Sequence, residues 1–195
     1  MPKIPVDTRE RILRTAAKLF YGKGIRSTGV DAIAEKAGVT KRTLYYHFRS
    51  KDDLIAAYLE ARDHPNRILF AKWFADAEGT LPDKVRALFT HLEAAARHPR
   101  WNGCGFLKTA AELAALPGHP AIKVAARHKA GVEAWLAETL ASKGVHDARG
   151  LARQIVILMD GAFSSMLVHR DPGYFEAAGR AAASLVGSQQ VGMGD

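Results

Sequence analysis

The sequence predicts an all-α fold of about nine helices, with a small three-helix domain over residues 1–51 and a larger helical domain over residues 52–195. Apolar residues recur at helical spacing from Asp7 almost to the end of the chain, and no segment shows the strict alternation of a half-buried strand. The net charge of +8 lies entirely in the first 51 residues, which carry twelve lysines and arginines against four acidic residues. A positive field confined to one domain favours a polyanion as partner, although a basic face can also serve solubility alone.

Composition narrows the classes of protein further. No run approaches the ~20 consecutive apolar residues of a membrane-spanning helix, and the N-terminal stretch lacks the apolar region of a signal peptide. We therefore expect a cytoplasmic protein with no membrane partner. The eight histidines and the single cysteine show no metal-ligand spacing, and no phosphate-binding or nucleophile motif occurs. We expect no metal, no cofactor and no enzymatic activity, and we read Cys104 either as a packed thiol or as a redox sensor.

The first helix is predicted to begin near Asp7 and to end at the glycines of residues 22–24. Asp7 and Glu10 have the spacing of a capping box, in which each carboxylate accepts from a backbone N–H of the first turn. Apolar residues from Ile12 to Phe20 then follow at helical spacing, with most of the basic residues off that stripe.

Two short helices follow, and the turn between them contains glycine. The second helix is predicted to begin at Thr28 and to end at Gly38, and the third begins at Thr40 and carries Leu44 and Phe48 on its inner side. Two short helices with such a turn are typical of a helix-turn-helix. The third helix would present hydrogen-bonding and cationic groups to the major groove of DNA, and its outward residues are Thr40, Lys41, Arg42, Thr43, Tyr45 and Tyr46. The alternative is a helical hairpin with a polar face.

The segment over residues 28–54 closely resembles the N-terminal domain of the tetracycline-repressor (TetR) family of transcriptional regulators, and the run over residues 43–48 is highly specific for that family. The resemblance is weak beyond residue 54. It implies that Lys41, Arg42 and Tyr45 face base edges. It also implies roles at the phosphate backbone, either in contact with phosphates or in positioning the residues that are, for Thr28, Thr43, Tyr46, His47 and Lys51. His47 is alternatively a packing residue.

The rest of the chain is predicted to be helical throughout. Ser50 and Asp53 cap a fourth helix over residues 51–77, in which His64 and Pro65 predict a kink or a true break. The further helices are expected over residues 79–98, 106–116, 120–143 and 147–169, and a last one from Asp171 to about Gly187. The tail over residues 188–195 is expected to be frayed.

The eighth and ninth helices are the predicted dimer surface. The eighth helix is apolar on more than one face, from Ile155 to Leu167, and the ninth is rich in alanine, which permits close helix approach. Two such helices from each subunit could form a four-helix bundle about a twofold axis, as the resemblance also implies. The alternative is that both faces belong to the internal core.

A small-molecule pocket is expected in the C-terminal domain, with large apolar walls and few polar groups. We expect Trp73, Phe89, Phe106 and Trp135 to line it, although each is equally well explained as an ordinary core residue. The hypothesis is therefore a ligand-responsive regulator, taken as a repressor, that binds a palindromic double-stranded DNA operator as a homodimer and is released by a small-molecule effector. An activator or a regulator without ligand shares these features. A sequence-nonspecific DNA-binding protein and a small all-helical enzyme are the alternatives.

Overall fold

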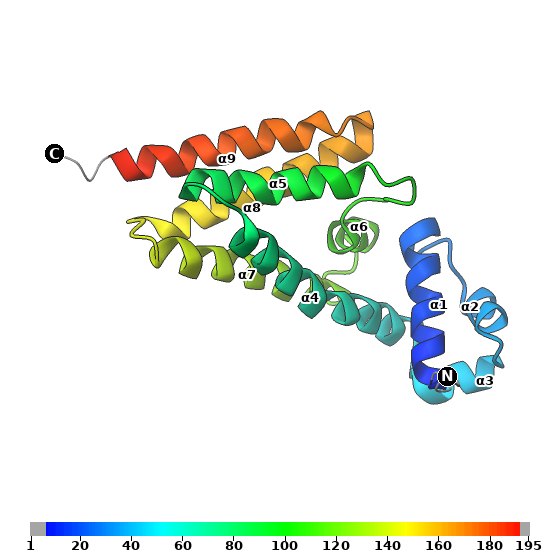
Figure 1. Ribbon diagram of the computed structural model, residues 1–195. Coiled ribbons are helices and arrows are strands. Elements are labelled where there is room, and N and C mark those ends of the chain that lie inside the picture. Colours follow the sequence, from blue (N-terminus) through cyan, green and yellow to red (C-terminus); the bar gives the residue numbers. More distant parts are fainter. Residues whose placement is uncertain (1–6, 192–195) are drawn as a thin grey trace, which may run out of the picture. The chain divides into compact units, whose positions relative to one another are not determined.

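The computed structural model describes residues 7–191, and these form nine α-helices and no strand (Figure 1). The predicted all-α fold is confirmed. The helices are α1 (Thr8–Lys23), α2 (Val30–Ala37), α3 (Lys41–His47), α4 (Lys51–Asp76), α5 (Leu81–Ala96), α6 (Gly105–Glu112), α7 (Pro120–Ala141), α8 (Ala148–His169) and α9 (Gly173–Val191).

The chain divides into two compact units. One contains residues 1–63 and 105–126, and the other contains residues 64–104 and 127–195. Helices α4 and α7 each begin in the first unit and end in the second. The predicted functional boundary after residue 51 stays a prediction.

The core of the first unit joins α1, α2 and α3 to the beginning of α4. Ile12 of α1, Ile33 of α2, Leu44 of α3 and Leu54 of α4 are all completely buried. The ring of Phe20 packs against that of Tyr58, with their centroids 5.8 Å apart. Since α2 and α3 are too short to be stable alone, this shared core is what holds them in place.

In the second unit, α9 packs along α5 and α8 (Figure 1). Phe175 of α9 is fully buried and meets Phe163 of α8 edge-on at 5.3 Å. The approach of α5 and α9 depends on Gly179, because a Cβ atom there would lie 2.8 Å from the Cβ atom of Phe89. Helix α5 begins with a complete capping box, in which Thr80 and Asp83 each accept from the other's backbone N–H.

The starts of two early helices differ from the prediction. The Asp7 side chain makes no capping hydrogen bond, and the Glu10 carboxylate instead pairs with Arg14 one turn later, at 2.8 Å. Helix α2 begins at Val30, after Gly29, and not at Thr28. The Thr28 hydroxyl donates to the Gly24 carbonyl at 2.7 Å and so belongs to the preceding turn.

Of the two outcomes considered for Pro65, a true break does not occur, because α4 is continuous through this residue. Proline removes one backbone donor, but Leu59 before it and Phe70 after it are buried and anchor both halves. A kink at this position stays a prediction.

The ends of α6 and α9 also differ from the prediction. Helix α6 ends at Glu112 and not near residue 116, and α9 continues to Val191, four residues beyond the predicted end. In the added turn, Ser188 donates its hydroxyl to the carbonyl of Leu185. Residues 192–195 of the predicted frayed tail lie outside the described residues.

We predict opposite effects for one substitution at two positions of α9. Gly179→Ala should lower the free energy of unfolding by about 1–2 kcal/mol, because the overpacking against the backbone-anchored Cβ of Phe89 outweighs the gain in helix propensity. Gly187→Ala should raise it by up to ~1 kcal/mol, since the nearest atom to its new Cβ, in Pro82, is 3.9 Å away. Urea denaturation of both variants measures this, and equal effects would contradict the close helix approach.

Candidate nucleic-acid interface

Helix α3 is fixed at both ends and along one side. At its start, the Thr40 hydroxyl accepts from the backbone N–H of Thr43 at 3.1 Å, as in a typical N-cap. Before it, Gly38 ends α2 in the left-handed conformation with φ +64°, which reverses the chain and is easily adopted by glycine. Leu44 and Phe48 bury the inner side. The outer side is therefore displayed by packing and capping together.

The outer side of α3 carries large exposed groups. Tyr45 is 42% and Tyr46 is 85% exposed, and the Arg42 side chain is exposed and forms no ion pair with any residue that the structure describes. Thr43 and His47 are half-buried, with the His47 ring edge-on to Tyr46 at 5.2 Å. A guanidinium group and two phenol rings on one exposed face can donate hydrogen bonds to base edges and pack on sugars or thymine methyl groups.

Lys41 differs from Arg42 because it has a partner. Its ammonium group lies 3.0 Å from the Asp31 carboxylate of α2, and the hydrogen bond and charge of Asp31 raise the pKa of Lys41. Part of the Lys41 charge is thus neutralised before any DNA arrives, which leaves Arg42 as the unpaired cation of the helix. No local pattern in the sequence indicates this pairing, because Asp31 lies ten positions earlier and on a different helix.

Two of the predicted phosphate contacts are joined to the loop before α2. Thr28 is only 2% exposed, with its hydroxyl bonded to Gly24. The Lys51 ammonium group, at the start of α4, donates to the Ile25 carbonyl at 2.8 Å. Both side chains are thus placed to hold the loop over residues 24–28.

Helix α6 holds the same loop from the other side. The Glu112 carboxylate accepts from the backbone N–H groups of Ile25 and Arg26, at 2.7 and 2.9 Å, and Arg26 returns a bond from its Nε to the Glu112 carbonyl at 2.8 Å. Gly24, with φ +92°, leaves room for this carboxylate, whose oxygen would lie 3.2 Å from a Cβ atom there. We call this group the Glu112 latch. No local pattern could have revealed it, because its partners are 86 and 87 positions apart.

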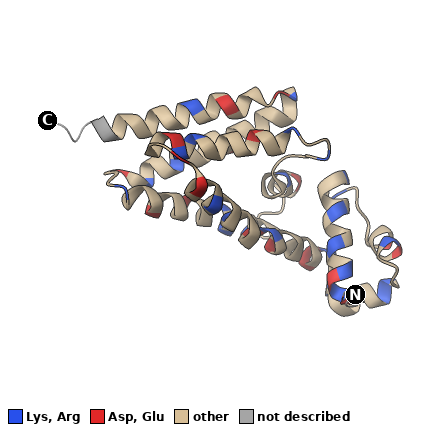
Figure 2. Ribbon diagram, in the orientation of Figure 1, with Lys and Arg blue, Asp and Glu red and all other residues tan. Residues whose placement is uncertain are grey.

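Helix α1 is strongly basic, with five lysines and arginines against one acidic residue, whereas α2 carries one lysine and two acidic residues (Figure 2). A hollow of about 540 Å³ between these helices is lined by Lys18, Lys23 and Lys36 together with Thr15, Leu19 and Gly22. None of the three lysines forms an ion pair within the part of the chain that the structure describes. They add unneutralised positive charge to the field of the interface.

The four residues predicted to line a ligand pocket lie in different surroundings, and their role in ligand binding stays a prediction. Trp73 stacks on His91 at 4.9 Å, and Trp135 meets Phe74 edge-on at 6.0 Å. Phe89 and Phe106 are each 1% exposed. Trp73, Phe89 and Trp135 belong to the second compact unit, whereas Phe106 belongs to the first.

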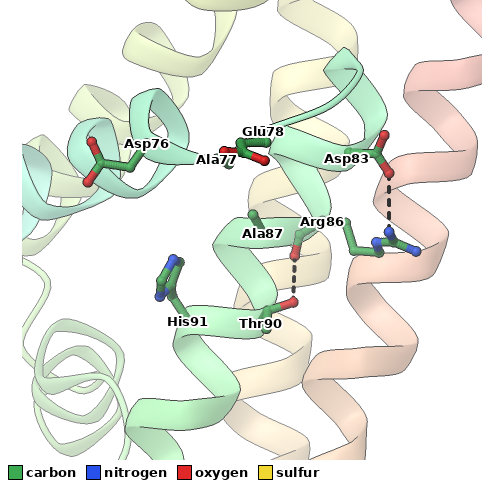
Figure 3. A pocket seen from close by; sticks show the side chains of 8 residues that line it. All are labelled: Asp76, Ala77, Glu78, Asp83, Arg86, Ala87, Thr90 and His91. Atoms are coloured by element: carbon green, nitrogen blue, oxygen red, sulfur yellow. Dashed lines mark hydrogen bonds and ion pairs between the residues drawn. The ribbon is translucent and has the colours of Figure 1, made fainter.

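A hollow of about 530 Å³ beside α5 is polar (Figure 3). Two of its three carboxylates, Asp76 and Asp83, are paired with Lys72 and Arg86, at 2.6 and 3.1 Å, whereas the third, Glu78, is exposed. The hydrogen bonds from Thr80 also lower the pKa of Asp83. The only apolar side chains in its lining are those of Ala77 and Ala87, so this hollow lacks the large apolar walls expected of the predicted small-molecule pocket.

Comparison with known proteins finds similar sequences and structures among bacterial transcriptional regulators. A family model described as "Bacterial regulatory proteins, tetR family" matches residues 12–58, which include all of α2 and α3. A TetR-family transcriptional regulator from Streptomyces coelicolor is 32% identical, with 96% of each chain covered and a TM-score of 0.78. A putative TetR transcriptional regulator from Streptomyces avermitilis is 32% identical over 94% of this chain and 98% of that one, with a TM-score of 0.81. The HTH-type transcriptional regulator YjdC of Escherichia coli K12 is 25% identical over 91% of this chain and 93% of its own.

We predict that Glu112→Ala destabilises the protein by about 1–3 kcal/mol, because it leaves two backbone N–H groups of the loop without their acceptor. Amide hydrogen exchange should become faster at Ile25 and Arg26. Glu138→Ala is the matched control, since that exposed side chain forms no ion pair in the described region. If exchange at both amides stayed at the wild-type rate, the latch would not hold the loop.

Proposed function

We propose that this chain, which belongs to the TetR family of bacterial regulatory proteins, is a ligand-responsive repressor that binds a palindromic operator as a homodimer. It is a helix-turn-helix transcriptional regulator and not an enzyme. Residues 1–51 bind DNA, residues 52–195 sense the ligand and dimerise, and the protein acts in the cytoplasm. The observation that carries the proposal is the exposed outer face of α3, with Arg42 unpaired between Tyr45 and the helix start.

Arg42 is the main residue that reads the base sequence. Its planar guanidinium can donate two hydrogen bonds to O6 and N7 of guanine in the major groove. Lys41 can reach a base only when it leaves Asp31, so it contributes less. Tyr45 packs on a sugar or a thymine methyl group. Arg42 is thus expected to contribute more to base recognition than Lys41, because its charge is not shared with a carboxylate.

The phosphate contacts are made by residues on or beside the exposed face of α3. Thr43, Tyr46 and His47 lie on or beside its exposed face and can donate to phosphate oxygens. Thr28 and Lys51 act by positioning, because both are bonded to the loop over residues 24–28.

The dimer forms through α8 and α9. On α8, Ile157 is 64% and Val168 is 75% exposed. Ile157 lines a hollow of about 560 Å³ with apolar walls, which is completed by Gln154, Leu158, Ala181, Ser184 and Leu185. Gly161 has open space around it, so a second helix can approach. Helix α8 is apolar and long enough to cross a membrane, yet only 44% of its most apolar stretch is buried; a second copy of the chain would cover the remainder.

A sequence-nonspecific DNA-binding protein is the second candidate, favoured by the unpaired lysines between α1 and α2. Selection of bound fragments from genomic DNA by the purified protein distinguishes the sequence-specific repressor from the nonspecific binder. The repressor requires that selected fragments share a palindrome and resist competition by random DNA, whereas the nonspecific binder would enrich none. An effector would then lower operator affinity by a coupling free energy of typically 1–3 kcal/mol.

We predict that Arg42→Ala relaxes the choice of base at one position of each half-site, by about 1–3 kcal/mol of discrimination. Affinities for operators with each base at that position measure this by fluorescence anisotropy. Arg149→Ala, which removes an exposed arginine of α8, is the control. Unchanged discrimination at every position would remove Arg42 from base readout.

We predict that Ile157→Asp dissociates the dimer, because each interface would bury two unpaired carboxylates at about 2 kcal/mol or more each. Sedimentation velocity should then report monomers at micromolar concentration. Leu116→Asp gives the same change at a residue that is 54% exposed but lies outside α8 and α9. A dimer that survives Ile157→Asp would exclude this face as the interface.

A further inference from the structure

We propose that Arg62 and Lys108, with the rings of Tyr21 and Tyr58, bind an anionic group of the effector, either a carboxylate or a phosphate. That the ligand is an effector rests on the proposed function, whereas the binding of the anion does not. All four residues belong to the first compact unit.

The first observation is the lack of a counter-charge at Arg62. Its side chain forms no ion pair and no hydrogen bond with any described residue, and its Nε atom is buried without a partner. The neighbouring acids Glu60 and Asp63 have interactions of their own, and residues one or two positions apart on a helix do not face each other. A half-buried guanidinium without a carboxylate is unusual, because buried charges are normally paired.

The second observation is the aromatic cage. The guanidinium carbon of Arg62 lies 5.1 Å from the ring centroid of Tyr21 and 5.8 Å from that of Tyr58. Both distances are within the range of a cation–π contact. The rings hold the planar guanidinium group in place but cannot neutralise its charge. The site is therefore organised before any anion enters.

The third observation is a second cation at the same ring. The Lys108 ammonium group lies 5.5 Å from the Tyr21 centroid and donates to the Tyr21 carbonyl at 3.0 Å. The start of α6 is also close, because a Cβ atom at Gly105 would lie 3.6 Å from the Arg62 Nε. The positive end of the α6 dipole therefore adds to the field of the two side chains.

This chemistry fits an anion with two or more oxygens. A guanidinium group can donate two parallel hydrogen bonds to a carboxylate or a phosphate, and a lysine adds a point charge. Both cations are half-buried, so their bonds to an anion would be less screened than bonds on an open surface.

The site is connected to the DNA-binding head through α6. Lys108 binds the carbonyl of Tyr21 near the end of α1, and Glu112, one turn later on α6, holds the loop before α2. An anion that draws Lys108 toward Arg62 competes with the bond to Tyr21. The binding of the anion and the placement of the head thus share one side chain.

The test uses the full-length protein and two probes, sodium benzoate and inorganic phosphate, each titrated against sodium chloride at equal ionic strength. We expect at least one probe to raise the Tm and to shift the Nε–H resonance of Arg62, assigned by its loss in Arg62→Lys. Arg62→Gln and Lys108→Gln should each weaken this binding about 10- to 100-fold. Arg149→Gln and Lys123→Gln are the matched controls and should bind the probe as the wild type does.

A further variant separates a binding role from a structural one. Arg62→Met should keep or raise the Tm without anion, because it removes an uncompensated charge, and it should abolish the rise with anion. A fall in Tm without anion together with a retained response to it would overturn the proposal, as would equal binding by Arg62→Gln and the wild type.

DNA affinity, measured in the same titrations, keeps the two proposals apart. If a probe binds at Arg62 and DNA affinity stays constant, the anion site stands and its role as effector site fails. If benzoate or phosphate releases DNA equally from the wild type and from Arg62→Gln, the regulatory function stands and the anion site is overturned.

Discussion

The DNA-binding face depends on the packing of a helix that is too short to be stable alone. Helix α3 has seven residues, and isolated helices of this length do not persist in water. Leu44 and Phe48 supply the burial, and the Thr40 hydroxyl satisfies one end. Every outward group, including Arg42, has a defined position only because the two buried side chains and the helix cap are in place.

The loop over residues 24–28 is the point where three separate parts of the first unit meet. Thr28 closes the loop from within, Lys51 binds it from α4 and Glu112 binds it from α6. All three bonds end on main-chain groups of the loop. The orientation of α2, and therefore of α3, is thus fixed by helices that carry no DNA-reading residue.

The sequence predicted the features that depend on local spacing and missed those that depend on distant partners. Helical periodicity placed all nine helices, and the segment that ends in Phe48 identified the family. The pairing of Lys41 with Asp31 and the Glu112 latch join elements that no period relates. At Pro65 the local rule leaves a kink and a true break open, and the burial of Leu59 and Phe70 on either side accompanies a helix that does not break.

The Glu112 latch binds mainly peptide groups, so the attachment of the loop over residues 24–28 to α6 tolerates mutation of most loop residues. Ile25 and Arg26 contribute their N–H groups to the carboxylate, which any residue except proline would also supply. Gly24 is restricted by its positive φ and by the carboxylate beside it, and Arg26 adds one side-chain bond to the Glu112 carbonyl. A foreign operator-reading module that keeps this glycine could therefore be grafted onto the same sensing body, and regulators of new promoters could arise by such exchange while the joint itself is inherited unchanged.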